Sequence, residues 1–123
     1  MDNYKCTISY CNKELSKRDT ISIKDTSSAT RLDTLISADG TFTITPDTIA
    51  VLDVENPHSE SKSYKVYVVI DKDGTKYSTG SEAFYRSLSD IAEEMGDEEF
   101  SIVVYKRESK NYKGKYFITC TIA

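Results

Sequence analysis

Residues 81–95 form the one segment whose apolar side chains recur at helical spacing, so the chain is restricted to folds that use a single long helix. The apolar stripe of this segment consists of Phe84, Leu88, Ile91, Ala92 and Met95. Thr79 or Ser81 supplies a hydroxyl that accepts hydrogen bonds from the first amide groups, and Gly96 supplies the positive φ that commonly ends a helix. We therefore predict one amphipathic helix over about residues 81–95.

The rest of the chain favours β-strands, because its segments alternate between polar and apolar residues or are rich in β-branched and aromatic ones. The expected strands are 4–10, 20–24, 41–44, 48–54, 64–70, 75–78, 100–107 and 115–122. Asp73-Gly74 predicts a tight hairpin between two of these strands. Residues 25–38 receive no assignment, since Leu32, Leu35 and Ile36 are their only apolar anchors.

The order of these elements is several strands, one helix and a closing hairpin. An all-β chain with one helix before its final hairpin matches the OB fold, a five-stranded barrel, although other small barrels and sandwiches share the pattern. At 123 residues, with no linker or internal repeat, the chain is expected to be a single domain over residues 1–123.

Charge is unevenly distributed along the chain. The net charge of −4 argues at first against a nucleic-acid partner, but binding depends on where the charges lie. Acidic residues gather at Glu93, Glu94, Asp97, Glu98 and Glu99. Basic residues gather in the final hairpin, at Lys106, Arg107, Lys110, Lys113 and Lys115. Acidic and basic residues therefore gather in two separate segments of the chain.

The loop of the final hairpin interleaves these cations with Tyr112, Asn111 and Gly114. Proteins bind single-stranded nucleic acid by neutralising phosphates with cations while aromatic side chains stack on bases, without regard to base identity. A lysine-rich hairpin is also commonly a solvated turn, or a device against aggregation at a sheet edge. The composition therefore favours a nucleic-acid interface without requiring one.

Nine tyrosines and no tryptophan supply the aromatic surface. Tyr4, Tyr10 and Tyr64 have apolar neighbours and are expected in the core. Other aromatic residues are expected to face outward: Tyr67, Tyr77, Tyr105, Tyr112 and Phe117, with Tyr116, Ile118, Cys120 and Ile122 pointing inward. The candidate contacts for single-stranded DNA are Tyr67, Tyr77, Tyr105, Lys106, Arg107, Lys110, Asn111, Tyr112, Lys113, Lys115 and Phe117.

Two motifs connect the C-terminal part to a known family. They are a D-G-x-x-Y-S turn and strand at residues 73–78 and, after the helix, an S-x-x-x-K-G-x-x-F step at residues 109–117. Over roughly residues 48–122 the chain resembles the small single-stranded-DNA-binding proteins of tailed phages that infect Gram-positive bacteria. The resemblance implies an OB fold that coats DNA without sequence preference, with Tyr77 and the hairpin Lys110–Phe117 as contacts.

The resemblance also implies a setting in phage or mobile-element DNA replication and recombination. Cellular bacterial relatives end in an acidic tail that recruits replication enzymes, whereas this sequence ends Thr-Cys-Thr-Ile-Ala. Replication or recombination proteins are therefore not expected to dock through such a tail. A homodimer is compatible with the strand edges expected at the N-terminus and in the last hairpin.

No catalytic motif is found in the sequence, and we expect no enzyme activity. Three scattered cysteines and the single His58 do not form a metal-binding pattern, so neither a metal nor another cofactor is expected. The acidic residues 93–99 are expected to be a solvated surface. The chain has neither a signal peptide nor an apolar run of about 18 residues, so a cytoplasmic protein is expected, in the host cytoplasm if it is phage-encoded.

Two functions from different classes follow. The first is a sequence-independent coat for single-stranded DNA, which the basic hairpin favours. The alternative is a phage-encoded protein-interaction module that inhibits a host enzyme through its acidic surface, because acidic patches can mimic DNA.

Overall fold

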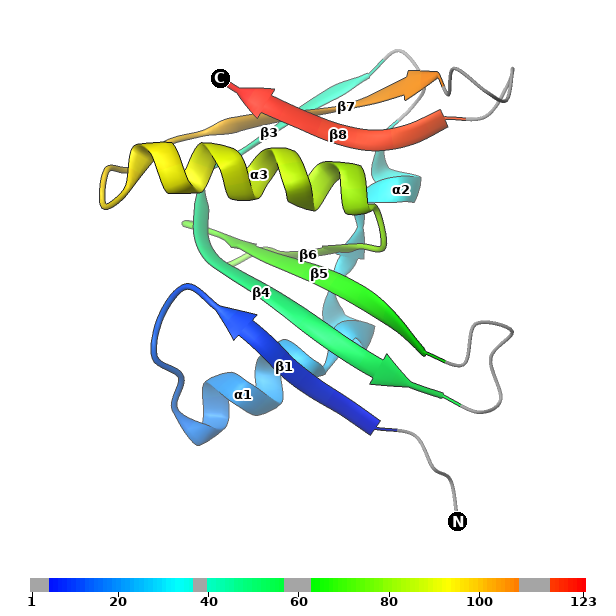
Figure 1. Cartoon of the computed structure of the whole chain (residues 1–123), viewed down its shortest axis with the longest axis vertical. Helices are drawn as coiled ribbons and strands as arrows, with labels where there is room; N and C mark the ends of the chain where they lie inside the picture. The colour runs from blue at the N-terminus through cyan, green and yellow to red at the C-terminus, as the bar shows by residue number, and fades with distance from the viewer. Residues whose placement is uncertain (1–4, 37–39, 57–62, 109–115) are drawn as a thin grey trace. The chain divides into compact units, whose positions relative to one another are not determined.

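The computed structural model describes residues 5–36, 40–56, 63–108 and 116–123. Within the chain, two compact units are distinguished (Figure 1). The first unit comprises Met1–Thr30 and Asp47–Gly80, and the second comprises Arg31–Pro46 and Ser81–Ala123. Each unit is held together mainly by its own sheet and helix, as described below.

The regular elements of the described residues follow the chain in this order: β1 Lys5–Cys11, α1 Lys17–Lys24, a short 3₁₀ turn Thr26–Ser28, β2 Thr30–Arg31, α2 Leu32–Leu35, β3 Thr41–Ile44, β4 Pro46–Glu55, β5 Ser63–Asp71, β6 Lys76–Thr79, α3 Glu82–Met95, β7 Ile102–Glu108 and β8 Tyr116–Ile122. The expectation of a mostly β chain is confirmed. The expectation of a single helix is wrong, because α1 and α2 accompany α3. None of the helices in the described residues is long and apolar enough to span a lipid bilayer.

The described strands form two sheets, in the orders β1-β4-β5-β6-β2 and β3-β7-β8, and these sheets do not close into one barrel. The division occurs where β3 is followed almost at once by β4. β3 pairs with β7, whereas β4 pairs with β1. Pro46, which has no amide hydrogen to donate to a ladder, begins β4 at the point where the chain changes sheet.

The core of the first unit lies on one face of the larger sheet. Its buried side chains are Ile23, Ala50, Leu52, Val54 and Val68, with Cys6, Ile8, Cys11, Leu15, Val66 and Ile70 packed around them. Ile23 comes from α1, so this short helix contributes to the core through one buried side chain. The hairpin expected at Asp73-Gly74 is confirmed: β5 pairs antiparallel with β6, and Gly74 has φ +91°.

The strand expected at residues 20–24 is wrong, because this segment belongs to α1. Ser16 caps the helix reciprocally with Asp19: Asp19 N donates to Ser16 Oγ at 3.1 Å, and Ser16 N donates to Asp19 Oδ2 at 3.3 Å. This capping box satisfies two amide groups that would otherwise lack an intrahelical acceptor. The local β propensity of Thr20 and Ile21 is therefore overruled by the cap and by burial of Ile23.

Two tyrosines expected in the core are exposed instead. The pairing of β1 with β4 shifts between Ile8 and Tyr10, so that Ile8 lies opposite Leu52 but Tyr10 lies opposite Val51. This β-bulge turns Tyr10 away from the core face that carries Leu52, and half of Tyr10 is exposed. Tyr64 lies near the start of β5, beyond the part of that strand whose side chains are buried. Tyr4 lies outside the described residues.

The second unit packs α3 against β8 of the three-stranded sheet (Figure 1). The predicted helix is confirmed: Ser81 is its N-cap, accepting from Phe84 N at 3.2 Å, and Gly96 ends it with φ +61°. Ser81 Oγ also donates to the carbonyl oxygen of Ile118 at 2.6 Å, which joins the start of α3 to β8. The buried side chains of this unit include Phe84, Leu88, Ile44, Ile102, Val104 and Ile118.

The segment 25–38 has no assignment from sequence. Its described residues, which end at residue 36, contain the 3₁₀ turn, β2 and α2. Leu32 and Ile36 are buried, whereas Leu35, the third apolar residue of this stretch, is exposed. The four-residue helix α2 therefore contributes to the core mainly through Leu32, the residue with which it begins.

Candidate nucleic-acid interface

One face of the three-stranded sheet carries two aromatic side chains and a cation. β7 and β8 are antiparallel, with Arg107 opposite Phe117 and Tyr105 opposite Thr119. Residues opposite each other share a face, and so do residues two apart on one strand. Tyr105, Arg107 and Phe117 therefore lie on one side of the sheet. We call this side the outer face. Its exposed or half-buried members are Tyr105, Arg107 and Phe117, together with Thr41, Thr43 and Thr121.

The outer face extends across β3 through exposed threonines. Thr41 lies opposite Tyr105, and Thr43 lies opposite Val103. Both threonines are exposed, as is Thr121 on β8. Arg107 is also exposed, Phe117 keeps 37% of its surface accessible, and Tyr105 is half-buried. Around Arg107 the surface therefore combines aromatic rings, a guanidinium group and hydroxyl groups. Thr119, which lies opposite Tyr105 on the same face, is buried instead, and its hydroxyl lies 3.3 Å from that of Ser87 on α3.

The opposite face of the same sheet forms the core of the second unit. Ile118 and Cys120, expected to point inward, are buried there, so that part of the prediction is confirmed. Tyr116 and Ile122 were also expected to be inward but are each 49% exposed, since they lie at the two ends of β8 beyond the buried residues.

Lys106 also belongs to this opposite face, because it pairs with Ile118. Lys106 and Arg107 are both among the predicted DNA contacts. The register instead separates them onto opposite sides of β7, because neighbouring residues of a strand alternate between faces.

Tyr67 and Tyr77 are buried, with only 6% of each accessible, so the expectation that they face outward is wrong. Tyr67 does lie opposite to the Val66–Val68 side of β5, as expected, but both sides of this strand are buried around residues 67–69. A signal for this was present: Val66-Tyr67-Val68-Val69-Ile70 is an unbroken apolar run, which is typical of a strand covered on both faces.

The surroundings of the Tyr77 hydroxyl agree with burial. Burial, followed by the nearby carboxylates of Asp71 and Asp73, raises the pKa of the Tyr77 phenol. Its side chain is also hydrogen-bonded to Thr75, in the β5–β6 turn. Tyr77 therefore offers no ring face for a base to stack on.

The remaining predicted contacts, Lys110, Asn111, Tyr112, Lys113 and Lys115, lie outside the described residues, as does His58. Of the predicted set, the structure thus brings together Tyr105, Arg107 and Phe117. The exposed threonines Thr41, Thr43 and Thr121 are not among the predicted contacts, because only the strand pairing shows that they share a face with these three residues.

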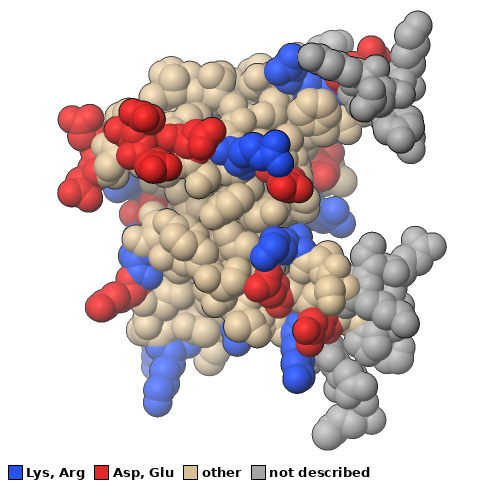
Figure 2. Space-filling view, in the orientation of Figure 1, with Lys and Arg blue, Asp and Glu red and all other residues tan. Residues whose placement is uncertain are grey.

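Acidic side chains gather over the C-terminal end of α3 (Figure 2). The exposed carboxylates at this end are Glu93, Glu94, Asp97, Glu98 and Glu99. The expectation of a solvated acidic surface is therefore confirmed. Among the described residues, no group of three or more His, Cys, Asp or Glu side chains is arranged to hold a metal ion.

Comparisons with protein-family models, with curated proteins and with solved structures gave no match to this chain. What the outer face can bind therefore has to be judged from its own chemistry.

Proposed function

We propose that the protein binds single-stranded DNA without sequence preference and coats such intermediates during phage or mobile-element replication and recombination, in the cytoplasm of the host cell. The observation that supports this most directly is the register of β7 and β8, which puts Tyr105, Arg107 and Phe117 on one accessible face. An aromatic ring stacks on any base, and a guanidinium group pairs with a phosphate.

The spacing of these residues suits a single strand. Residues diagonal to each other across an antiparallel pair have Cα atoms about 7–8 Å apart, close enough for long side chains to meet. Tyr105 and Phe117 are such a diagonal pair, and Arg107 neighbours both, opposite Phe117 and two residues along β7 from Tyr105. Two unpaired bases could stack on the rings while the phosphate beside them meets the guanidinium group. Each stacked base would contribute about 1–3 kcal/mol.

Duplex DNA is a poor fit to the same surface, because its bases are already stacked on each other and present only their edges in the grooves. The exposed threonines can donate hydrogen bonds to phosphates or bases but do not read a sequence by themselves. We expect additional phosphate contacts from the basic segment 110–115, on the basis of its sequence.

The OB-type barrel expected from the element order is not needed for this proposal. An accessible sheet face with aromatic residues is sufficient, and a three-stranded sheet supplies it. The net charge of −4 is also compatible, because exposed carboxylates are concentrated at the end of α3 rather than on the outer face.

The direct test is fluorescence anisotropy with labelled oligo-dT, mixed-sequence single strands and a duplex of equal length. Comparable affinities for the single strands, much weaker binding of the duplex, and a log–log salt slope of about −0.7 per phosphate are expected. Binding of the duplex as tight as that of the single strands would rule the proposal out.

The alternative function, inhibition of a host enzyme through the acidic surface, is favoured by one observation: five carboxylates at the end of α3 are all exposed. The double substitution Glu93→Lys and Glu94→Lys, which reverses the charge of both side chains, distinguishes the two functions. Binding to oligo-dT should persist or increase in this variant if the outer face is the site, whereas a protein inhibitor that acts through its carboxylates would lose its partner.

A further inference from the structure

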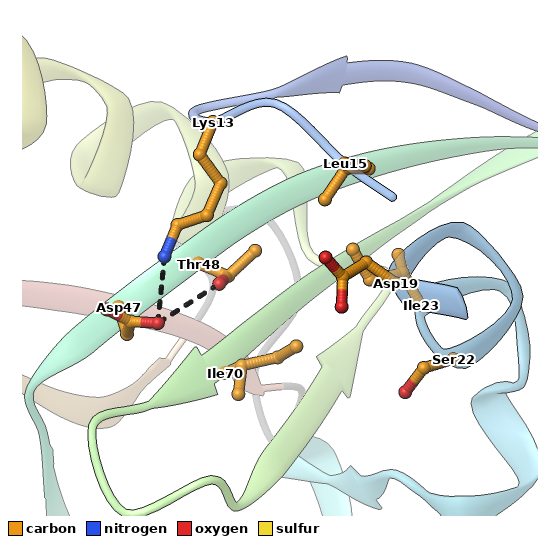
Figure 3. Close-up of a pocket in the computed structure, with 8 residues that line it drawn as sticks. All are labelled: Lys13, Leu15, Asp19, Ser22, Ile23, Asp47, Thr48 and Ile70. Carbon is orange, nitrogen blue, oxygen red and sulfur yellow. Dashed lines mark hydrogen bonds and ion pairs between the residues drawn. The ribbon is translucent and has the colours of Figure 1, made fainter. Parts of the chain in front are cut away.

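A small pocket lies in the first unit, between α1 and the adjoining ends of β4 and β5 (Figure 3). Its volume is about 170 Å³. It is lined by Lys13, Leu15, Asp19, Ser22, Ile23, Asp47, Thr48 and Ile70. None of these residues belongs to the outer face, so the pocket raises a question separate from DNA binding.

One wall of the pocket is an ion-paired carboxylate. Lys13 Nζ lies 2.8 Å from Asp47 Oδ2, and Lys72 Nζ lies 3.6 Å from Asp47 Oδ1. Thr48 Oγ1 lies 3.4 Å from Asp47 Oδ2. The hydrogen bond from Lys13 is the main cause of a lowered pKa of Asp47, so this carboxyl group is ionised at neutral pH. The negative charge of Asp47 is therefore already balanced by two lysines.

The other wall belongs to α1, and the part of the chain that the structure describes shows no ion pair of the Asp19 carboxylate there. Lys76 Nζ donates to the backbone carbonyl oxygen of Ser22 and leaves the Ser22 hydroxyl unengaged. Asp19 and Ser22 are one turn apart on the helix, and both side chains line the pocket (Figure 3). The hydrogen bond that the structure gives for the Asp19 carboxylate within its described residues comes from the backbone amide of Ser16. A second carboxylate oxygen and the Ser22 hydroxyl therefore remain as acceptors for a ligand.

The remaining surface of the pocket is apolar. Leu15, Ile23 and Ile70 line it from three different segments, and Ile23 is almost fully buried. Pockets for drug-sized ligands usually measure about 300–1,000 Å³. This pocket is smaller, so it suits a short chain of a few heavy atoms rather than a ring system or a nucleotide.

We propose that this pocket binds a primary alkylammonium group, with the ammonium on Asp19 and Ser22 and the methylene chain on Leu15, Ile23 and Ile70. A free alkylamine and the end of a lysine side chain share this chemistry. Both combine a cation that donates three hydrogen bonds with a flexible apolar stem. The inference does not rest on the proposed function, since every residue it uses lies in the first unit.

The test is a titration of the ¹⁵N-labelled full chain with n-butylamine at pH 7, followed by amide chemical shifts. Saturable shifts centred on Asp19, Ser22 and Thr48 are expected. 1-Butanol has a similar tail without the charge, and ammonium chloride has the charge without the tail. Each should bind at least about tenfold more weakly, because loss of one charged hydrogen bond or of the buried tail costs this much.

The matched variants are Asp19→Asn and Asp90→Asn. Asparagine at position 19 still offers an oxygen to the Ser16 amide, so the helix cap is retained while the charge is lost. We expect affinity for n-butylamine to fall about tenfold or more in Asp19→Asn. Asp90 is an exposed carboxylate on α3, and Asp90→Asn should leave the affinity for n-butylamine unchanged. Ser22→Ala should weaken binding by a smaller factor.

A further arm of the same titration identifies the source of the amine. Nα-acetyl-lysine methylamide should match n-butylamine if the pocket takes a lysine side chain from a partner, and bind more weakly if it takes free amines. Equal binding of 1-butanol and n-butylamine, unchanged affinity in Asp19→Asn, or shifts centred elsewhere would overturn the proposal.

Discussion

Arg107 on β7 lies directly opposite Phe117 on β8, and both side chains are exposed on the same face of the three-stranded sheet. Cross-strand pairs of this kind contribute roughly 0.2–1 kcal/mol, and a guanidinium group over an aromatic ring is itself a favourable arrangement. The backbone pairing holds the two residues side by side, so a base and its phosphate can meet both without a movement of either strand.

Replacing Phe117 by alanine should weaken binding to oligo-dT by about 1–3 kcal/mol, because one stacking ring is lost. Tyr116 is the matched control, since it is an exposed aromatic neighbour that points to the other face of the same strand. Tyr116→Ala should leave the affinity within about twofold. Fluorescence anisotropy measures both variants, and equal losses would show that the outer face is not the site.

Replacing Arg107 by glutamine should reduce both the affinity and its dependence on salt. Loss of one phosphate contact lowers the log–log salt slope by about 0.7. Lys106→Gln is the control, because Lys106 carries the same charge on the same strand but faces the other side. The slopes are measured from titrations at several salt concentrations. An effect of Lys106→Gln as large as that of Arg107→Gln would contradict the register-based assignment.

Replacing Tyr77 by leucine should lower stability without a direct effect on DNA binding. A buried ring is exchanged for a smaller apolar side chain, which costs about 1–3 kcal/mol through loss of packing. Urea denaturation measures this cost, and anisotropy at low temperature measures DNA affinity of the folded variant. A tenfold loss of affinity in the folded protein would restore Tyr77 as a candidate contact.

Replacing Ser81 by alanine should destabilise the protein by about 1–3 kcal/mol, because it removes two hydrogen bonds. One caps α3 at the amide of Phe84, and the other joins the helix to the carbonyl oxygen of Ile118. Ser89→Ala, at an exposed position of the same helix, should change the free energy of unfolding by less than about 0.5 kcal/mol. Chemical denaturation of the two variants gives the comparison.

The Cys120 thiol should make stability fall at alkaline pH. Burial raises the pKa of Cys120 from 9.0 to about 12, so the folded chain keeps the proton after the unfolded chain has lost it. Stability is unaffected below pH 9 and decreases as the pH rises from about 9 towards 12, by up to about 1.4 kcal/mol per pH unit. Other groups titrate in this range, so the free energy of unfolding is measured against pH for both the wild type and Cys120→Ala, and the two curves are subtracted. If the free energy of unfolding falls equally in both proteins above pH 9, Cys120 is not the cause of the alkaline loss of stability.

Much of the second unit was predictable from sequence because its signals are local. The cap at Ser81, the apolar stripe of α3 and the positive φ at Gly96 lie within one continuous segment. The opposite orientations of Phe117 and Ile118 likewise follow from the alternation of a single strand. These features depend on residues close together in the chain, so a periodic pattern is enough to find them.

The incorrect predictions missed either a local helix cap or contacts between residues far apart in sequence. The segment 20–24 has strand-like composition, but a capping box and the burial of Ile23 make it helical. The alternation of residues 4–10 predicts that Tyr10 points inward, but a bulge in the pairing of β1 with β4 turns the Tyr10 side chain to the other face. Tyr77 has polar neighbours and Tyr67 lies in an apolar run, yet both side chains were expected to face outward and both are buried.

For this protein, the sequence by itself determined that the chain is mostly β, where α3 begins and ends, and that aromatic residues and cations alternate in the last hairpin. Only the tertiary structure decided that β3 and β4 belong to different sheets and that Arg107 of β7 lies directly opposite Phe117 of β8. The physical reason is that helical and strand periods are set by neighbouring residues. Which face of a strand is covered, and which side chains it meets there, is set by partners that pairing brings from distant parts of the chain.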